Sequence, residues 1–143
     1  MLAISQAQGG EAYAVVADVT KNADNRRIVG ETLTKYGRLD VSFINAGTGE
    51  RVSITELDED LLDKLLATNV KGVAYAFQYQ LPAIEKSGGK GSILVNSSCA
   101  GSRATANPDF RSGGVYAASK AAANMLAQYA VSVCHCTGTH LEY

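Results

Sequence analysis

The sequence predicts one α/β domain built on a parallel sheet, and three observations lead to this prediction. Short apolar runs rich in β-branched residues alternate with longer stretches of helical period. These helical stretches are long enough to connect parallel strands, which need crossovers of a dozen or more residues. Polar residues follow the strands directly, at 18, 45–47 and 97–98, where ligands of open α/β sheets bind. With 143 residues, 46% of them hydrophobic, the chain is long enough for one core and too short for two.

The first part of the chain is expected to form two strands on either side of a helix. Residues 12–17 (AYAVVA) are a β-branched run bounded by glycines and an aspartate, which is typical of a buried strand. Residues 22–36 carry apolar side chains on roughly one face and stop at Gly37, as a surface helix does. Residues 41–44 (VSFI) form the second predicted strand.

The second part is expected to continue the alternation. An apolar stripe of helical period runs through residues 56–84, and Pro82 is expected to kink or end that helix. Residues 92–96 (SILVN) form a third buried strand, and residues 115–133 form an alanine-rich helix. Right-handed crossovers between these strands predict helices on both faces of the sheet. The tail at 133–143 does not resemble a further strand.

Composition and charge exclude several classes of protein. Thirteen basic and fourteen acidic side chains leave a net charge of −1, which gives no electrostatic reason to expect nucleic acid or an anionic membrane as a partner. No apolar stretch has the length of a membrane span, and the first ten residues do not resemble a secretory signal. Three cysteines in such a chain indicate a reducing compartment, so we expect a cytoplasmic protein.

Tyr116 and Lys120 form the pair that best fits a chemical role. They are four residues apart near the start of the last helix, in VYAASKAA, so their side chains share one face. A neighbouring ammonium group favours the phenolate form, which suits a general acid/base near neutral pH. The pair alone has a second interpretation, in which the tyrosine lies at an interface and the lysine is solvated.

Two further polar residues could complete a site. Ser98 follows the third strand and can donate a hydrogen bond to a developing oxyanion. Asn69 interrupts the apolar stripe of the long helix, in TNVKG, where a buried amide needs a partner. Taken by itself, Asn69 is either a satisfied core amide or the holder of a water molecule near the site.

With these residues in place, the sequence resembles the short-chain dehydrogenases/reductases. The resemblance extends from about residue 9 to about residue 132 and rests on five motifs in the family's order. No single motif is decisive, but each one falls at the expected strand end or helix. The motifs are Asp18-Val19, Asn45-Ala46-Gly47, Asn69-Val70, Asn96-Ser97-Ser98 and Tyr116-Ala117-Ala118-Ser119-Lys120.

The resemblance implies a Rossmann-type three-layer α/β/α sandwich with a parallel sheet, present as its central portion at 1–132. It implies reversible hydride transfer between NAD or NADP and a small alcohol or carbonyl substrate, with the hydride chemistry supplied by the cofactor. Tyr116 is then the acid/base, Lys120 its neighbour and a donor to the nicotinamide ribose, and Ser98 the residue that polarises the carbonyl.

The remaining family positions imply contacts to the relay and to the cofactor. Asn69 would hold a water molecule in a proton relay. Asp18, with Val19, would contact the adenine, and Asn45, Ala46 and Gly47 would line the adenosine side.

The sequence also departs from the family pattern. The family's glycine-rich TGxxxGxG turn, which binds the pyrophosphate at a helix N-terminus, does not occur in the printed sequence. Met1 is expected to fall within the helix before the family's third strand, so apolar sheet surface would remain uncovered. Ser98 and Tyr116 are eighteen residues apart, and residues 107–114 enlarge the loop between them.

Other signals were weighed against simpler explanations. Cys134, His135, Cys136 and His140 supply an incomplete zinc set, so we expect no metal site. Cys99 has no evident activating partner. In family members the helices corresponding to about 57–85 and 115–133 commonly pack against a twin subunit, which predicts a homo-oligomer; ordinary helix-on-sheet packing is the alternative.

Three functions therefore remain open at the level of sequence. The first is an NAD(P)-dependent oxidoreductase with Tyr116, Lys120, Ser98 and Asn69 as its catalytic set. The second is a catalytically inactive fragment or a non-catalytic assembly module of the same family. The third is a nucleotide sensor, which would bind the cofactor without turnover and would not need the catalytic set.

Overall fold

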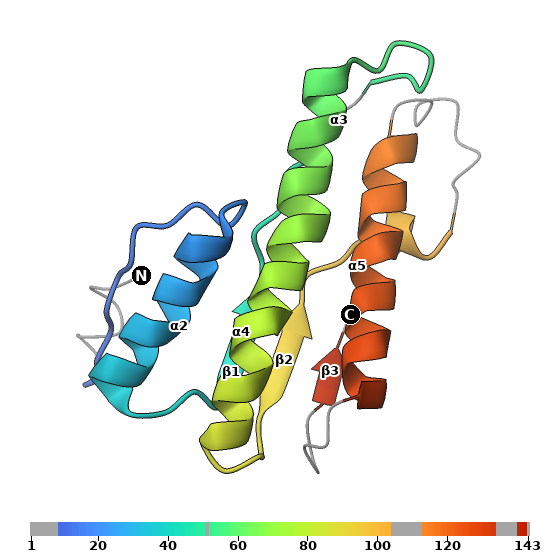
Figure 1. Cartoon of the computed structure of the whole chain (residues 1–143). Coiled ribbons are helices and arrows are strands. Elements are labelled where there is room, and N and C mark those ends of the chain that lie inside the picture. Colours follow the sequence, from blue (N-terminus) through green and yellow to red (C-terminus); the bar gives the residue numbers. More distant parts are fainter. Residues whose placement is uncertain (1–8, 51, 104–112, 134–139, 143) are drawn as a thin grey trace.

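The three strands among the described residues form one parallel sheet. The computed structural model describes residues 9–50, 52–103, 113–133 and 140–142. The strands are β1 (Val41–Ile44), β2 (Ser92–Val95) and β3 (His140–Glu142), in the spatial order β1-β2-β3. Val41 pairs with Ser92, and Ser92 pairs with His140, so β2 is the central strand (Figure 1). The predicted parallel α/β sheet is confirmed.

One long helical path connects β1 to β2, and a second helix connects β2 to β3. Helix α2 (Asn22–Tyr36) precedes β1 and packs beside α4 (Gly72–Lys86), where Asn22 forms hydrogen bonds with Gln78 and Tyr79. A short 3-10 helix, η2, follows β2. The elements are α2 (Asn22–Tyr36), α3 (Glu59–Leu66), the π-helical turn η1 (Ala67–Lys71), α4 (Gly72–Lys86), η2 (Cys99–Gly101) and α5 (Gly114–Val133).

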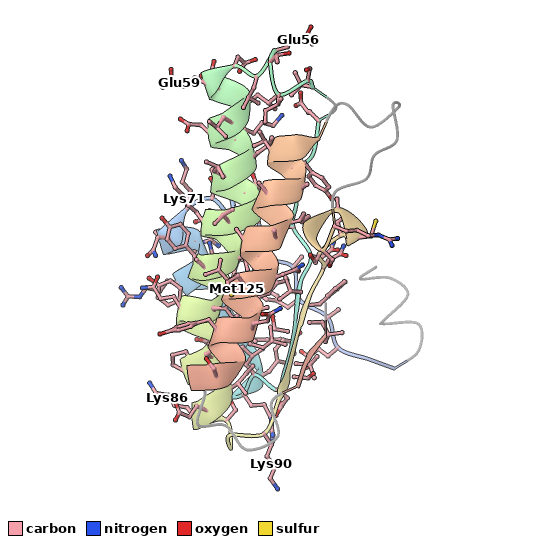
Figure 2. All side chains as sticks on the ribbon, turned by 90° about the vertical axis from the view of Figure 1, so that its right-hand side faces the viewer. Glu56, Glu59, Lys71, Lys86, Lys90 and Met125 are labelled. Carbon is pink, nitrogen blue, oxygen red and sulfur yellow. The ribbon has the colours of Figure 1, made fainter. Side chains whose placement is uncertain are left out.

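Within the described residues the helices lie on one face of the sheet. Figure 2 shows α4 and α5 on one side and the strands on the other. Side chains along β1 alternate accordingly, because Ile44 is buried under the helices while Val41 and Phe43 are 62% and 63% exposed. Successive right-handed crossovers that advance in one direction place their helices on the same face. The described crossovers advance in one direction only, so the predicted second layer of helices is not found on the far face within the described residues, and Val41 and Phe43 are exposed there.

The core lies between the sheet and the two long helices. Ile93 of β2 and Ile84 of α4 have no exposed surface, and alanines of α5 let that helix approach the sheet closely. Burying large aliphatic side chains completely contributes about 1.5–3 kcal/mol each relative to exposure. The core residues are Ile44, Val73, Ala76, Phe77, Ile84, Ile93, Val95, Ala123, Ala127 and Ala130.

The prediction of a buried strand at 12–17 is wrong. The segment runs beside α2 without strand pairing, and Val16 is 93% exposed. Its contacts are polar: Arg27 donates to the Val16 carbonyl at 2.6 Å, and Tyr13 donates to Glu31 at 3.2 Å. A strand requires a neighbouring strand for its amides, and none of the described strands pairs with this segment.

The helix stop predicted at Gly37 is confirmed, and of the two effects predicted for Pro82, a kink or a helix end, the helix end is wrong. Helix α2 ends as predicted, with Gly37 in the left-handed region at φ 75° and its N–H bonded to the Leu33 carbonyl. Pro82 does not end its helix, since α4 continues to Lys86. Pro82 is exposed, so the carbonyl that loses its partner one turn earlier lies on the side where water can reach it.

The prediction that the tail at 133–143 forms no further strand is also wrong. Residues 140–142 pair with β2, although the sequence of the tail does not resemble a strand. Helix α5 returns the chain to the free edge of β2, where unpaired backbone groups accept a partner of almost any sequence. Cys134, His135 and Cys136, and residues 107–112 of the enlarged loop, lie outside the described residues. Among the described helices, none combines the length and hydropathy needed to span a bilayer.

Candidate active site

The candidate site begins where β1 and β2 end. The Asn96 N–H donates to the Ile44 carbonyl at 2.9 Å, which extends the pairing of the two strands by one residue. The Asn96 side chain donates to Oδ1 of Asn45 at 2.7 Å. The two asparagines therefore join the loop after β1 to the loop after β2, at the sheet edge where the sequence placed its candidates.

Lys120 is a buried cation directed at this edge. Its side chain is 6% exposed, and Nζ donates to the Asn96 carbonyl at 2.7 Å. None of the carboxylates in the described part of the chain forms an ion pair with it. Burial lowers the pKa of the Lys120 ammonium group below its ordinary value, because the interior disfavours the charged form. Buried unpaired charge of this kind is typical of functional sites.

Tyr116 lies beside that cation, as the four-residue spacing predicted. Nζ of Lys120 is 5.9 Å from the centre of the Tyr116 ring. The ring packs on the backbone of Gly49, where an added Cβ would lie 3.0 Å from a ring carbon. A side chain at position 49 would displace the ring by a few tenths of an ångström, so glycine at this position lets the phenol lie where it does. Gly49 is not among the site residues predicted from the sequence.

Asn69 is buried in the π-helical turn η1 and connects two other segments. Its Nδ2 donates to the Thr48 carbonyl at 2.8 Å and to Oγ of Ser119 at 2.9 Å. Its Oδ1 accepts from the Thr48 N–H at 2.9 Å. Both N–H groups of the amide are thus hydrogen-bonded within the protein. The side chain can still accept a hydrogen bond from water through the second lone pair of Oδ1. Single π-helical turns occur frequently at functional sites.

Ser98 begins the short helix η2 at the end of β2. Its Oγ accepts from the Ala100 N–H at 3.2 Å, and none of the described residues accepts its hydroxyl proton. η2 packs directly on α5, because a Cβ on Gly101 would lie 2.8 Å from the Lys120 carbonyl carbon. Ser98 therefore lies near the Lys120 backbone, and its hydroxyl group can still donate a hydrogen bond.

Residues 45–47 form an exposed strip of backbone over the same groups. A Cβ on Gly47 would lie 3.2 Å from Nζ of Lys120 and 3.5 Å from Oδ1 of Asn69. Asn45, Ala46 and Gly47 thus border the polar cluster, and the absence of a side chain at 47 leaves the ammonium group accessible from this side.

Asp18 and Val19 lie in the turn before α2, where no described contact joins them to Tyr116 or Lys120. Oδ1 of Asp18 accepts from the Thr20 N–H at 2.9 Å and from the Thr20 hydroxyl at 2.7 Å. These bonds lower the pKa of the Asp18 carboxyl. A Cβ on Gly72 would lie 3.3 Å from the Val19 carbonyl, which places this turn against the start of α4.

A cavity of about 470 Å³ opens at the end of β2, partly on the uncovered face of the sheet. Of the four predicted catalytic residues it contains only Ser98. Asn124 and Ser97 also line it, each with a buried side-chain oxygen that has no hydrogen-bond partner among the described residues. The lining residues are Phe43, Leu94, Val95, Asn96, Ser97, Ser98, Cys99, Ser102 and Asn124.

Ser119 is a second residue that sequence reasoning missed. It is 1% exposed and bonds both to Asn69 and to the Tyr116 carbonyl. The available signal was a serine on an alanine-rich helix, three residues after the tyrosine and therefore on a neighbouring part of the same face.

Comparison with known proteins assigns the family. The family model described as short chain dehydrogenase matches residues 1–135. An uncharacterized oxidoreductase of Listeria monocytogenes is 35% identical over 117 residues, which are 80% of this chain and 44% of the relative. An alcohol dehydrogenase of Thermococcus sibiricus, solved with 5-hydroxy-NADP, superposes with a TM-score of 0.86 at 25% identity, covering 97% of this chain and 56% of that one.

A third similar protein was solved with both a cofactor and a second small molecule bound. A 7 alpha-hydroxysteroid dehydrogenase, solved with NADH and 7-oxo glycochenodeoxycholic acid, superposes with a TM-score of 0.85 at 25% identity, covering 98% of this chain and 52% of that one. The chain spans about half the length of the relatives it matches. It belongs to the short-chain dehydrogenase/reductase family.

Proposed function

We propose that this chain carries the acid/base part of an NAD(P)-dependent oxidoreductase that interconverts alcohols and carbonyl compounds. The observation that supports it most is Lys120, a nearly buried cation without a described ion pair that lies 5.9 Å from the Tyr116 ring. Folding gains little from such a charge, whereas a tyrosine that exchanges protons gains a neighbour that favours phenolate.

Each residue of the set has a separate task in this proposal. Tyr116 gives its phenolic proton to the carbonyl oxygen during reduction and takes a proton from the alcohol during oxidation. Ser98 donates its free hydroxyl proton to the same oxygen and stabilises the charge that develops there. Lys120 stabilises the phenolate that remains. A bound nicotinamide cofactor supplies or accepts the hydride.

The residues present fit part of that cofactor. Lys120 donates one of its three N–H groups to Asn96, so the other two can meet ribose hydroxyls where Gly47 leaves space. Asp18 and Val19, with Asn45 and Ala46, are proposed for the adenosine side. Relatives solved with 5-hydroxy-NADP and with NADH make both cofactors candidates. Because three cysteines in this chain favour a reducing compartment, we propose the cytoplasm as its location.

Cofactor titration and one substitution test the proposal. The protein is titrated with NADH and NADPH by nicotinamide fluorescence, and alcohols and ketones are then screened with the bound cofactor. Tyr116→Phe should abolish turnover and leave the cofactor Kd within about twofold, because the lost hydroxyl transfers protons. Tyr36→Phe, at the far end of α2, is the matched control and should behave as wild type. Turnover that survives in Tyr116→Phe would remove that residue from the acid/base role.

A second candidate function, assembly through the helices, has its own observation. A groove of about 340 Å³ lies between α4 and α5, with Phe77, Leu81 and Leu126 among its lining residues. Tyr129 lines it and is 66% exposed, and Met125 on the same helix, labelled in Figure 2, is 63% exposed. Exposed apolar side chains beside a groove suit a second copy of this chain. An assembly module would form oligomers yet fail to bind either cofactor.

A further inference from the structure

Ser119 is a buried serine with two hydrogen bonds, and it has no role in the reaction proposed above. Its side chain is 1% exposed, inside a helix whose buried positions are otherwise mostly alanine. Its hydroxyl donates to the Tyr116 carbonyl at 2.7 Å and accepts from Nδ2 of Asn69 at 2.9 Å. One donor and one acceptor direction of the hydroxyl are thus engaged.

These bonds belong to a longer chain that crosses three segments. Thr48, in the loop after β1, exchanges two hydrogen bonds with the Asn69 amide at 2.9 and 2.8 Å. Asn69, in η1, donates to Ser119 of α5, and Ser119 donates to Tyr116. The loop after β1 also holds Gly49, on which the Tyr116 ring packs. The loop after β1 therefore contacts Tyr116 in two ways, directly through Gly49 and indirectly through Thr48, Asn69 and Ser119.

We propose that Ser119 is a positioning residue for the acid/base. It couples the Asn69 amide to the first turn of α5, so that the Tyr116 ring, the Gly49 backbone and the Lys120 ammonium group keep one relative arrangement. This inference rests on the function proposed above, because it concerns how Tyr116 is aligned for proton transfer. Ser119 itself touches neither substrate nor cofactor in this account.

Removal of the hydroxyl has a defined local result. In Ser119→Ala, one N–H of the Asn69 amide loses its acceptor in a buried place, and a buried unsatisfied donor is unfavourable. The amide can then rotate away or recruit water, which weakens its bonds to Thr48. The Tyr116 carbonyl keeps its ordinary helical partner, so α5 itself should persist.

Three variants and two measurements test the proposal. Ser119→Ala should lower kcat about tenfold and change KM and the cofactor Kd less than twofold, because alignment affects the reacting state. Ser119→Thr retains a hydroxyl that can bond the carbonyl three residues earlier, and it should restore kcat to within about threefold. Ser132→Ala is the matched control, since Ser132 makes the same type of bond to the Tyr129 carbonyl but is exposed.

The second measurement needs no turnover. Amide hydrogen exchange at the Thr48 N–H reports whether Oδ1 of Asn69 still accepts from it. Exchange there should rise at least fivefold in Ser119→Ala and should be unchanged in Ser132→Ala and Ser119→Thr. Exchange at Thr48 that is equal in Ser119→Ala and wild type would overturn the proposal.

The outcomes separate this inference from the proposed function. If Tyr116→Phe retains turnover or wild type has none, the function fails, and the Thr48 exchange still decides whether Ser119 positions Asn69. If Tyr116→Phe is inactive while Ser119→Ala keeps the wild-type kcat, the function stands and the positioning role is overturned. A loss of kcat in Ser119→Ala that Ser119→Thr does not restore also overturns it.

Discussion

Gly101 is the residue whose replacement should most directly separate Ser98 from Lys120. In Gly101→Ala the new Cβ would lie 2.8 Å from the Lys120 carbonyl carbon and 3.0 Å from both the Lys120 oxygen and the Ala121 nitrogen. All three are backbone atoms of α5, which cannot turn aside as a flexible side chain does. Ordinary contact begins near 3.4 Å, so η2 must retreat by about 0.6 Å.

That displacement predicts both a loss of stability and a loss of activity. Overpacking of this kind destabilises by about 1–3 kcal/mol. Ser98 begins the displaced helix, and misplacing a catalytic group by 1 Å can lower the rate about a hundredfold, so a shift of this size should lower kcat/KM about tenfold. Urea denaturation followed by circular dichroism gives the free energy of unfolding, and steady-state kinetics give the rate.

Gly30→Ala is the control for this substitution. Gly30 is exposed within α2, and a Cβ there meets nothing within 4 Å. Its replacement should stabilise the protein by about 0.5–1 kcal/mol, since alanine loses less backbone entropy in a helix. If Gly101→Ala is as stable as wild type, η2 does not pack on α5 as described, and the argument for the placement of Ser98 fails.

Two further substitutions test the buried cation and the groove. The pKa of Lys120 is lower in the folded protein than its ordinary value of 10.5. Between these two pKa values the unfolded chain therefore binds one more proton than the folded protein. The free energy of unfolding of wild type should rise with pH through that interval, relative to that of Lys120→Met. Urea denaturation of both proteins at pH 7 and pH 10 measures it, and parallel curves would refute it. Tyr129→Glu places a charge in the α4–α5 groove and should reduce the proposed oligomer to monomers in light scattering; an unchanged oligomeric mass would exclude this groove as the interface.

Local pattern was sufficient for the elements whose partners lie within the described chain. The helix ending at Gly37 was predicted to the residue because a left-handed glycine cap is a local signal. Strands were predicted at 41–44 and 92–96, and they form at 41–44 and 92–95, because apolar side chains dominate both runs. Residues 12–17 have the same composition but no paired strand, and 140–142 have a paired strand without the composition. Strand formation depends on the neighbour as well as on the sequence.

The same distinction applies to the site. The juxtaposition of Tyr116 and Lys120 follows from helix geometry, so spacing alone predicted it. Asn69 and Ser119 are fifty residues apart and meet through packing of η1 on α5, which no local pattern specifies. Gly49 and Gly101 matter because of what their missing side chains would strike, and that is a property of the assembled fold.

The arrangement around Lys120 opposes stability and is therefore informative about function. Burial disfavours its charge, and within the described chain it has one hydrogen bond, to the Asn96 carbonyl, and no ion pair. An apolar side chain of similar length would fill the same volume without that penalty. The rest of the site acts in the opposite direction, since Asn69 and Ser119 are bonded on both sides and Gly49 and Gly101 bring three segments into close contact. If Tyr116 transfers protons as proposed, these contacts are what would hold the Lys120 ammonium group beside it despite the cost of burying the charge.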